Sequence, residues 1–336
     1  MSTNALRCLM AGLAVVGMTA APLAQSVELR LATVVPDGSI WDAGLRQMAA
    51  AVRKDTANRV TITVFSGGSQ GDEPTVLRKM RLNALQAASL TVVGLASIDP
   101  AFNVFNVPFF FKSYDELNGV VESLSPFFQQ RLKDKGFILL NWGHGGWLQV
   151  FSKDPIESVA DLKALRLYTS AGDDQMTQWY KASGYQPRAM AMTDILTGLT
   201  TGMIDALPTT PIAAMAFQWN RQAPYMLDIG LAPVVGATVV SARAWKQMGD
   251  AERAALQKAS AAVETQLKAE VPKQDVFAVA LMSVQGLQVT KASGPEWGAE
   301  AERLAAEMRG DMVPAGVFDM VLRERDAYRK RAGTTR

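Results

Sequence analysis

The segment over residues 154–211 most constrains the fold that this chain can adopt, because strand-like and helix-like stretches alternate along it. Its predicted elements are a capped turn that leads into a strand ending at Tyr168-Thr169-Ser170, a helix over 175–183 closed by Gly184, a helix over 192–202 and a strand over 203–207. Elements in this order, with short connections, predict a parallel sheet covered by helices. Such sheets bind ligands at the carboxyl ends of their strands, so we expect Tyr168 to face a ligand.

The size and charge of the chain narrow the class of protein. With 336 residues, the chain is long enough for two domains of ordinary size, each with its own core. Hydrophobic residues make up 49% and charged residues 20% of it, which is typical of a globular protein. The net charge of +2 comes without a basic cluster, so the sequence does not favour nucleic-acid binding.

The first 26 residues have the pattern of a cleavable secretory signal. Arg7 is the only charged residue among them, an apolar run follows over 8–18, and small residues follow over 19–26. The apolar run is shorter than the ~20 residues that span a bilayer, which disfavours an uncleaved membrane anchor. We expect cleavage after Ala24 or Ser26 and export to the periplasm.

Residues that could support catalysis or metal binding are scarce. Cys8 is the only cysteine and lies in the predicted signal, and His144 is the only histidine. Nucleophilic triads and most zinc sites need histidine or cysteine partners. We therefore expect no catalytic residue, no metal site and no cofactor in the mature chain, which argues against a secreted hydrolase or lyase.

The remaining elements predict a second α/β unit. Strands are expected over 27–35, 59–65, 88–93, 137–142 and 233–241, with helices over 40–54 and 73–82. Ser39 is the predicted N-cap of the first helix, and the phenylalanine-rich segment over 102–111 is interpreted as core packing. A long helix over 251–282 should begin at an Asp250 cap and be kinked or locally ended at Pro272.

Together these elements predict an α/β protein with the two-lobed periplasmic-binding-protein fold, built from two α/β lobes, a hinge and a long bridging helix. The glycine-rich segment over 143–147 is the expected crossing between the lobes. The predicted division is a signal peptide over 1–26, lobe I over 27–145 with about 236–265, and lobe II over 146–235 with about 266–330.

Four segments, in this order, carry a resemblance to a known family: SGGSQGDE at 66–73, NVPFFF at 106–111, SVADLKALRL at 158–167 and MTDILTGLTTGMIDA at 192–206. Over nearly all of its mature length, the chain resembles the extracytoplasmic solute-binding subunit of a tripartite ATP-independent periplasmic (TRAP) transporter of the DctP family. The resemblance implies a ligand-capture protein and not an enzyme. Such a protein closes its lobes around a small organic acid and delivers it to membrane permease subunits.

The chain departs from this family at the position that usually anchors the ligand. Members hold the ligand carboxylate with an arginine, whose guanidinium forms two charge-assisted hydrogen bonds with it. That position falls on Tyr168 here, and a second, usually basic, position falls on Leu148. Arg166 lies two residues before the anchor, ~6–7 Å further from the strand end, and is not counted as a replacement.

Candidate ligand-binding residues follow from these positions. Trp147, Leu148 and Tyr168, together with Trp41, would provide an apolar surface for stacking and one phenolic donor. The further candidates are Glu73 and Gln70 beside the cleft, Thr209 as a hydroxyl contact, Arg188 as a displaced arginine, Asp173 for a cationic ligand group and His144 at the crossing. Each of these charged candidates has an alternative structural role: a first-turn acid favoured by the helix dipole for Glu73, helix capping for Asp173 and surface exposure for Arg188. His144 has a structural role as its alternative.

The expected function is capture of a small organic acid with an aromatic or hydrophobic body. The expected partners are this ligand and the TRAP permease subunits, with the receptor itself a monomer or a dimer. The alternative is a periplasmic binding or trafficking protein for a neutral or hydrophobic ligand, which works without a TRAP permease.

Overall fold

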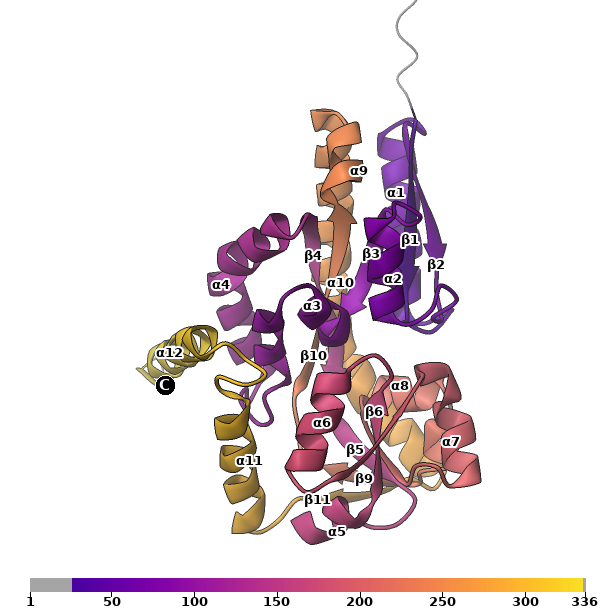
Figure 1. The fold of residues 1–336 in the computed structure, drawn as a ribbon. Coiled ribbons are helices and arrows are strands. Elements are labelled where there is room, and N and C mark those ends of the chain that lie inside the picture. The colour runs from indigo at the N-terminus through magenta and orange to yellow at the C-terminus, as the bar shows by residue number, and fades with distance from the viewer. Residues whose placement is uncertain (1–25, 335–336) are drawn as a thin grey trace, which may run out of the picture.

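The structure is a computed structural model that describes residues 26–334 and consists of two mixed β-sheets with helices packed on them (Figure 1). The predicted signal peptide lies outside the described residues, apart from Ser26. Within the described residues, the first sheet has five strands in the order β2-β1-β3-β10-β4, and the second has six in the order β11-β9-β5-β8-β6-β7. This arrangement confirms the prediction of two α/β lobes.

In the first sheet, β1 lies between β2 and β3 and pairs in parallel with both, whereas β10 is antiparallel to β3 and β4. The strands are β1 (Val27–Thr33), β2 (Val60–Phe65), β3 (Ala87–Thr91), β4 (Phe137–Trp147) and β10 (Pro233–Ser241). Helices α1 (Ile40–Asp55) and α2 (Glu73–Arg81) connect the parallel strands. The side chains of Ser39 and Asp72 cap these helices by accepting N–H groups of the first turn, which confirms the cap predicted at Ser39.

In the second sheet, β6 pairs in parallel with both β7 and β8, which confirms the parallel unit predicted for residues 154–211. The strands are β5 (Gln149–Ser152), β6 (Arg166–Ser170), β7 (Gln186–Met190), β8 (Ala206–Thr209), β9 (Tyr225–Asp228) and β11 (Gln288–Lys291). The helices between them are α5 (Val159–Ala164), α6 (Asp174–Ala182), α7 (Ile195–Thr201) and α8 (Pro211–Ala216). Strand β8 begins later than predicted, because Gly202 adopts a φ of 75° that ends α7 and a turn precedes the strand.

The glycine-rich segment after Trp142 continues β4 as a strand and is not the loose crossing predicted from the sequence. A Cβ at Gly143 would lie 3.1 Å from the backbone of Gly236, so glycine permits the close approach of β10. The chain crosses between the sheets just beyond this strand. There the N–H of Leu148 donates to Ala232 O at 2.8 Å, and the N–H of Leu231 donates to Leu148 O at 2.9 Å. The two crossing segments are therefore hydrogen-bonded to each other at Leu148.

Helix α10 (Asp250–Val284) is the predicted bridging helix, and it packs into the cores of both lobes (Figure 1). Its Leu256 and Val263 belong to the core cluster around β1 and α1, whereas its Ala278 and Met282 belong to the cluster of the second sheet. The helix continues through Pro272. The N-cap is Gly249 and not the predicted Asp250, whose carboxylate instead lies in the first turn, where the helix dipole favours negative charge.

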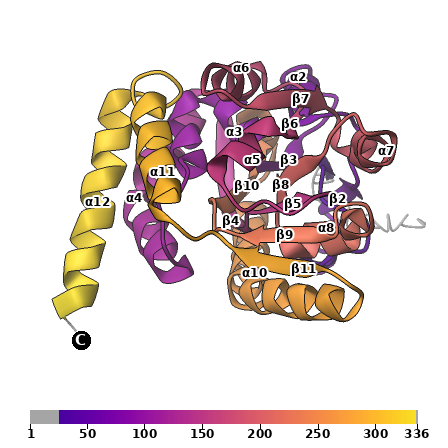
Figure 2. The ribbon, with the colours of Figure 1, turned by 90° about the horizontal axis from the view of Figure 1, so that it is seen from below.

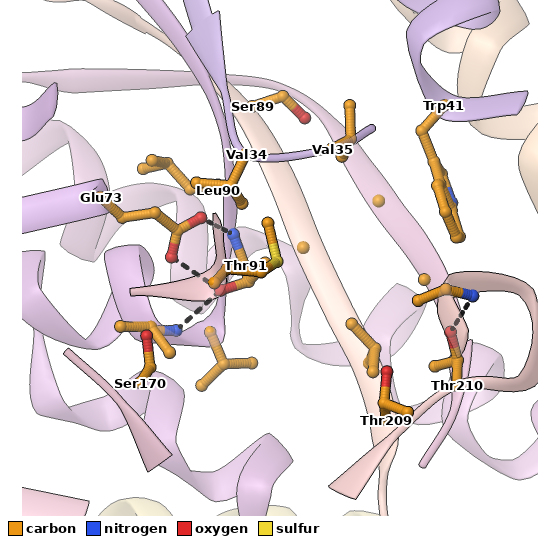
Figure 3. A pocket seen from close by; sticks show the side chains of 18 of the residues that line it. Val34, Val35, Trp41, Glu73, Ser89, Leu90, Thr91, Ser170, Thr209 and Thr210 are labelled. Carbon is orange, nitrogen blue, oxygen red and sulfur yellow. Dashed lines mark hydrogen bonds between the residues drawn. The ribbon is translucent and has the colours of Figure 1, made fainter. Parts of the chain in front are cut away.

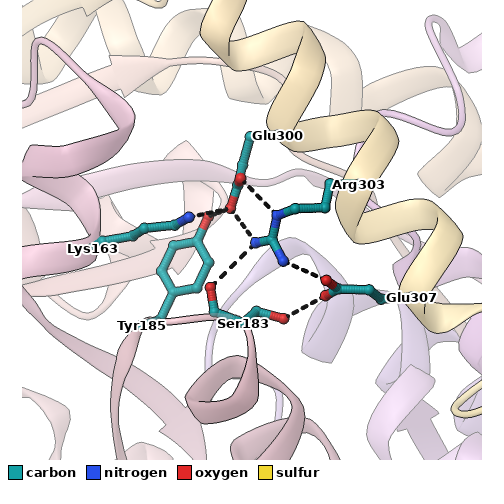
Figure 4. A network of polar contacts seen from close by, with 6 residues as sticks. All are labelled: Lys163, Ser183, Tyr185, Glu300, Arg303 and Glu307. Atoms are coloured by element: carbon teal, nitrogen blue, oxygen red, sulfur yellow. Dashed lines mark hydrogen bonds and ion pairs between the residues drawn. The ribbon is translucent and has the colours of Figure 1, made fainter.

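The C-terminal helices α11 (Pro295–Met308) and α12 (Ala315–Thr334) form a further connection between the lobes. Glu300 of α11 accepts hydrogen bonds from Lys163, Tyr185 and Arg303, which hold α11 on the second lobe (Figure 4). Helix α12 lies beside α4 (Tyr114–Asp134) of the first lobe (Figure 2), where Arg329 donates to Glu116 at 2.8 Å. The division into lobe I (27–145 with about 236–265) and lobe II (146–235 with about 266–330) remains a proposal.

The phenylalanine-rich segment is buried, as predicted. It forms the 3-10 helix η1 (Pro100–Asn106) and the turn after it, and Phe102, Phe105 and Phe111 are at most 2% exposed. The helix α3 (Val92–Ile98) precedes this segment, and α9 (Ala242–Gln247) follows β10. Among the residues that the structure describes, no helix has both the length and the hydropathy that crossing a membrane requires.

Candidate functional site

A cavity of about 410 Å³ lies between the two sheets (Figure 3). On one side it is lined by the carboxyl ends of β1 and β3 and by the first turns of α1 and α3. On the other side it is lined by the carboxyl ends of β6 and β8 and by residues of α7 and α8. Strands β4 and β10 and helix α10 complete the wall. The cavity thus lies where parallel sheets expose their strand ends, which is the position expected for a ligand.

Apolar side chains form most of the cavity wall. They include Val34, Val35, Trp41, Leu45, Leu148, Ile195, Leu207, Phe217, Trp219, Val263 and Leu267. The indole N–H of Trp41 donates to His144 O at 2.8 Å, so this polar group is already satisfied. Phe217 and Trp219 stack with their ring centroids 4.6 Å apart. The surface therefore offers ring faces and branched aliphatic groups to a ligand.

Uncharged hydroxyl groups supply polar contacts at the strand ends. Tyr168 and Ser170 come from β6, Thr209 from β8 and Ser89 from β3. Burial raises the pKa of the Tyr168 phenol to about 12, so at neutral pH the phenol is protonated and can donate a hydrogen bond. The hydroxyls of Ser89 and Thr209 form no hydrogen bond with other described residues. Figure 3 shows Ser89 and Thr209 on opposite sides of the cavity.

The Glu73 carboxylate lies at the cavity wall but is already hydrogen-bonded to the protein (Figure 3). It accepts the N–H of Thr91 at 2.6 Å, the hydroxyl of Thr91 at 2.7 Å and the N–H of Gly94 at 2.8 Å. Burial raises the pKa of this carboxyl, and the hydrogen bonds from Thr91 and Gly94 oppose the rise. Glu73 therefore fixes the start of α3, which is a structural role.

No lysine or arginine is among the described residues that line the cavity. Arg166 lies at the start of β6, where its guanidinium forms two hydrogen bonds of 2.6 Å with Asp205. Arg188 on β7 pairs in register with Tyr168, but it is exposed, donates to Pro187 O at 3.1 Å and does not line the cavity. The predicted displaced arginine is thus near the cavity but outside its wall.

His144, on β4, is among the residues that line the cavity, and its contact with a ligand stays a prediction. Burial lowers its pKa to about 4, with a further contribution from the positive charge of Lys268. The imidazole is therefore uncharged at neutral pH. Its Nε2 has no hydrogen-bond partner among the described residues.

Three further candidates do not line the cavity, and each has another role. The side-chain oxygen of Gln70 accepts from Lys79 Nζ at 3.1 Å, and Asp173 caps α6 by accepting the N–H of Met176 at 3.1 Å. Trp147 packs edge-to-face against Tyr114, with ring centroids 5.2 Å apart. Gln70, Asp173 and Trp147 thus lie outside the cavity wall, where local hydrogen bonds and core packing hold their side chains, and their contact with a ligand stays a prediction.

Several lining residues were not predicted from the sequence. Ser89 lies within a strand that was predicted over 88–93, but near its amino end, so the expectation of a ligand at the carboxyl end did not mark it. Phe217 is the C-cap of α8, and Trp219 begins the 3-10 helix η3 (Trp219–Arg221). No sequence pattern marks either of them as a lining residue. Met192, in the 3-10 helix η2 (Met192–Asp194), also lines the cavity without a sequence pattern that marks it.

Two α/β lobes that are joined by crossing segments and enclose a cavity at their strand ends define the class of two-lobed solute-binding proteins. The chain belongs to the family described as bacterial extracellular solute-binding protein, family 7 (DctP), whose model matches residues 31–310. This family consists of substrate-binding receptors, so the protein is a receptor and not an enzyme.

Individual relatives agree with this assignment. A solute-binding protein of Chromohalobacter salexigens is 26% identical over 219 residues, a match that covers 64% of this chain and 65% of the relative. A solved TRAP periplasmic solute-binding protein from the same species, with bound D-glucuronate, has a TM-score of 0.81 at 20% identity, covering 89% of this chain and 99% of the other. DctP7 of Bordetella pertussis, an extracytoplasmic solute receptor binding pyroglutamic acid, has a TM-score of 0.81 at 22% identity, covering 90% and 100%.

Proposed function

We propose that this protein is the extracytoplasmic receptor of a TRAP transporter, which captures a small organic solute between its lobes. The observation that carries this proposal is the cavity of about 410 Å³ lined by strand ends of both sheets. A ligand there would contact both lobes at once, so its binding energy would favour the closed arrangement. The hydrogen-bonded crossing at Leu148 and the bridging helix α10 are the segments about which the lobes would move.

Export to the periplasm and delivery to a permease are further parts of this proposal. The secretory pattern of residues 1–26 supports export. Membership of the DctP family supports delivery to membrane permease subunits. Transport of a labelled solute by reconstituted permease subunits, with and without this protein, distinguishes a TRAP receptor from a binding protein that works alone.

Two ligand classes are candidates. The relatives bind D-glucuronate and pyroglutamic acid, which makes an organic acid the first class. An uncharged solute with an apolar body is the second, and one observation favours it: none of the described lining residues is a lysine or an arginine. A buried carboxylate without a cationic partner is costly.

A thermal-shift screen of organic acids, aromatic acids and neutral apolar solutes tests the capture function. A ligand that binds only the folded state raises the melting temperature by mass action. The Leu148→Trp variant fills the cavity and should lose the shift, whereas the Leu82→Trp control, at a side chain that is 74% exposed and outside the cavity, should keep it. Shifts that persist equally in both variants would place binding elsewhere and contradict the proposal.

A further inference from the structure

The described residues that line the cavity offer no positive charge to a ligand at neutral pH. The only one of them that could become cationic is His144, whose burial lowers its pKa to about 4. Arg166 is bound by Asp205, and its guanidinium lies at the opposite end of β6 from the cavity. Arg188 is exposed and outside the lining. An ionised carboxylate in the cavity would therefore lose its water without gaining an ion pair.

The two carboxylic side chains among the described lining residues offer no positive charge either. Asp72 is the N-cap of α2 and Glu73 lies in its first turn. Both are at the wall formed by the first lobe. Their oxygens accept hydrogen bonds from Thr91, Gly94 and Thr75, so both carboxylates are held in place. A carboxyl group held in this way gives an anionic ligand no cationic partner, and in its ionised form it repels the ligand.

The uncharged polar groups of the wall are suited to neutral oxygen and nitrogen functions. The phenol of Tyr168 and the hydroxyls of Ser89 and Thr209 can each donate one hydrogen bond and accept others. They come from strands of both sheets, so a ligand with polar groups at two ends could bind both lobes together. Such bonds orient a neutral ligand without an ion pair.

The apolar wall and the volume set the size of the ligand body. A cavity of ~150 Å³ holds benzene. The cavity here, of about 410 Å³, therefore has room for a ring with substituents, or for two rings. The stacked pair Phe217 and Trp219, the ring of Trp41 and the aliphatic groups around them give such a body a closely matched surface.

We infer that the solute is uncharged when bound: a ring-sized apolar body that carries neutral hydroxyl, carbonyl or amide groups, held by Tyr168, Ser89 and Thr209 without an ionic anchor. This inference rests on the proposed capture function and specifies its ligand class. It requires that a neutral compound binds better than the matched anion of the same shape.

Matched pairs of an acid and its primary amide test this inference by calorimetry at neutral pH. The probes are benzoate with benzamide, phenylacetate with phenylacetamide, and cyclohexanecarboxylate with its carboxamide. We expect the amide of at least one pair to bind ~10-fold or more tightly than its acid, because the acid must bury an unpaired charge. An acid that binds more tightly than its amide in every pair overturns the inference while leaving the capture function intact.

Two variants test whether the preference for the amide over the acid arises from the charge of the cavity wall. Tyr168→Arg places a guanidinium in the cavity and should reverse the preference, so that the acid of the pair binds ~10-fold or more tightly than the amide. Arg188→Gln should leave both affinities unchanged, because Arg188 lies outside the lining. Acid binding that is lost in Arg188→Gln would show an ionic anchor and overturn the inference. A folded wild-type protein that binds no probe of either kind would overturn the inference but not the capture function, which the thermal-shift screen of organic acids tests separately.

Discussion

Gly172 lies against Pro74 across the opening between the lobes: a Cβ at Gly172 would lie 2.9 Å from Cγ of Pro74. Gly172 follows β6 of the second sheet, whereas Pro74 lies in the first turn of α2, beside the first sheet. Gly172 also has a φ of +85°, a conformation that residues with a Cβ rarely adopt. The two lobes thus come together at a point where only glycine fits without rearrangement.

The first prediction is that Gly172→Ala weakens ligand binding by hindering closure. The added methyl group would clash with Pro74 only when the lobes are together, so it should lower affinity by ~10-fold or more. Gly184→Ala is the matched control, because Gly184 has a φ of +88° and a Cβ there would meet no described atom within 4 Å. Titration calorimetry should show lost affinity in Gly172→Ala alone. Equal affinities in the two variants would rule out a role in closure.

The second prediction concerns Asp275, which links α10 to the crossing. Its carboxylate accepts the N–H groups of Trp147 at 3.1 Å and Ile212 at 3.3 Å, and the Tyr114 hydroxyl at 3.2 Å. Burial raises its pKa to about 6, and these hydrogen bonds oppose the rise. Because the folded pKa exceeds the unfolded value, the stability that Asp275 contributes at low pH is lost as pH rises through about 6.

The Asp275→Asn variant removes this titration. Between pH 4 and pH 7 the wild-type free energy of unfolding should fall relative to that of the variant by on the order of 2–3 kcal/mol. Urea denaturation across this pH range measures the difference, with the exposed Asp154→Asn as control. A difference between wild type and Asp275→Asn that does not change with pH would contradict the raised pKa.

The third prediction is that Glu73→Gln destabilises the fold more than it affects the ligand. An amide has one acceptor oxygen, so it cannot accept all three hydrogen bonds that the carboxylate receives from Thr91 and Gly94. We expect a loss of ~1–3 kcal/mol in the free energy of unfolding, measured by urea denaturation, with the exposed Glu157→Gln unchanged. Unchanged stability with a lower ligand affinity would instead assign Glu73 to the ligand.

The fourth prediction tests the attachment of α11 to the second lobe (Figure 4). Burial raises the pKa of Glu300, but hydrogen bonds from Arg303, Lys163 and Tyr185 outweigh it and lower the pKa to about 2. The stability from this ionised group is present above the unfolded pKa and is lost as pH falls toward 2. Glu300→Gln should therefore lower the melting temperature at neutral pH, and its deficit should shrink in acid. The neighbouring exposed Glu302→Gln should show neither effect.

The fifth prediction separates the two contributions of Tyr168 to ligand binding. Tyr168→Phe keeps the ring and removes the hydroxyl, so affinity should fall by ~0.5–1.5 kcal/mol if the phenol donates to the ligand. Calorimetry with the best neutral ligand measures this change. An unchanged affinity would limit Tyr168 to packing against the ligand.

Much of the fold follows from local patterns in the sequence. The alternation of strands and helices over 154–211 predicted the parallel arrangement of β6, β7 and β8, because such connections leave few other topologies. Ser39 was predicted as a cap because its side chain acts on the turn that directly follows it. Strand β4 was predicted too short, because its pairing with β10, almost a hundred residues away, decides its length.

Only part of the candidate site could be predicted, because sequence patterns locate strand ends but not the partners of polar side chains. Tyr168 and Thr209 lie at strand ends, which sequence patterns locate, and both line the cavity. Gln70 and Asp173 were also candidates, but their side chains bind Lys79 and the N–H of Met176 instead. Which partner a polar side chain takes depends on the distances between groups, and a sequence pattern does not contain those distances.

The sequence by itself determined that residues 27–336 contain no cysteine and a single histidine, and that two α/β units form around short connections. It also contains 34 lysines and arginines, and no pattern shows which of them face a ligand. Only the tertiary structure decided that none of those described lines the cavity, with Arg166 held by Asp205 and Arg188 turned to solvent. Contacts between segments that are far apart in the chain decide which charged side chains line the cavity. The charge of the site is therefore defined only in the folded protein.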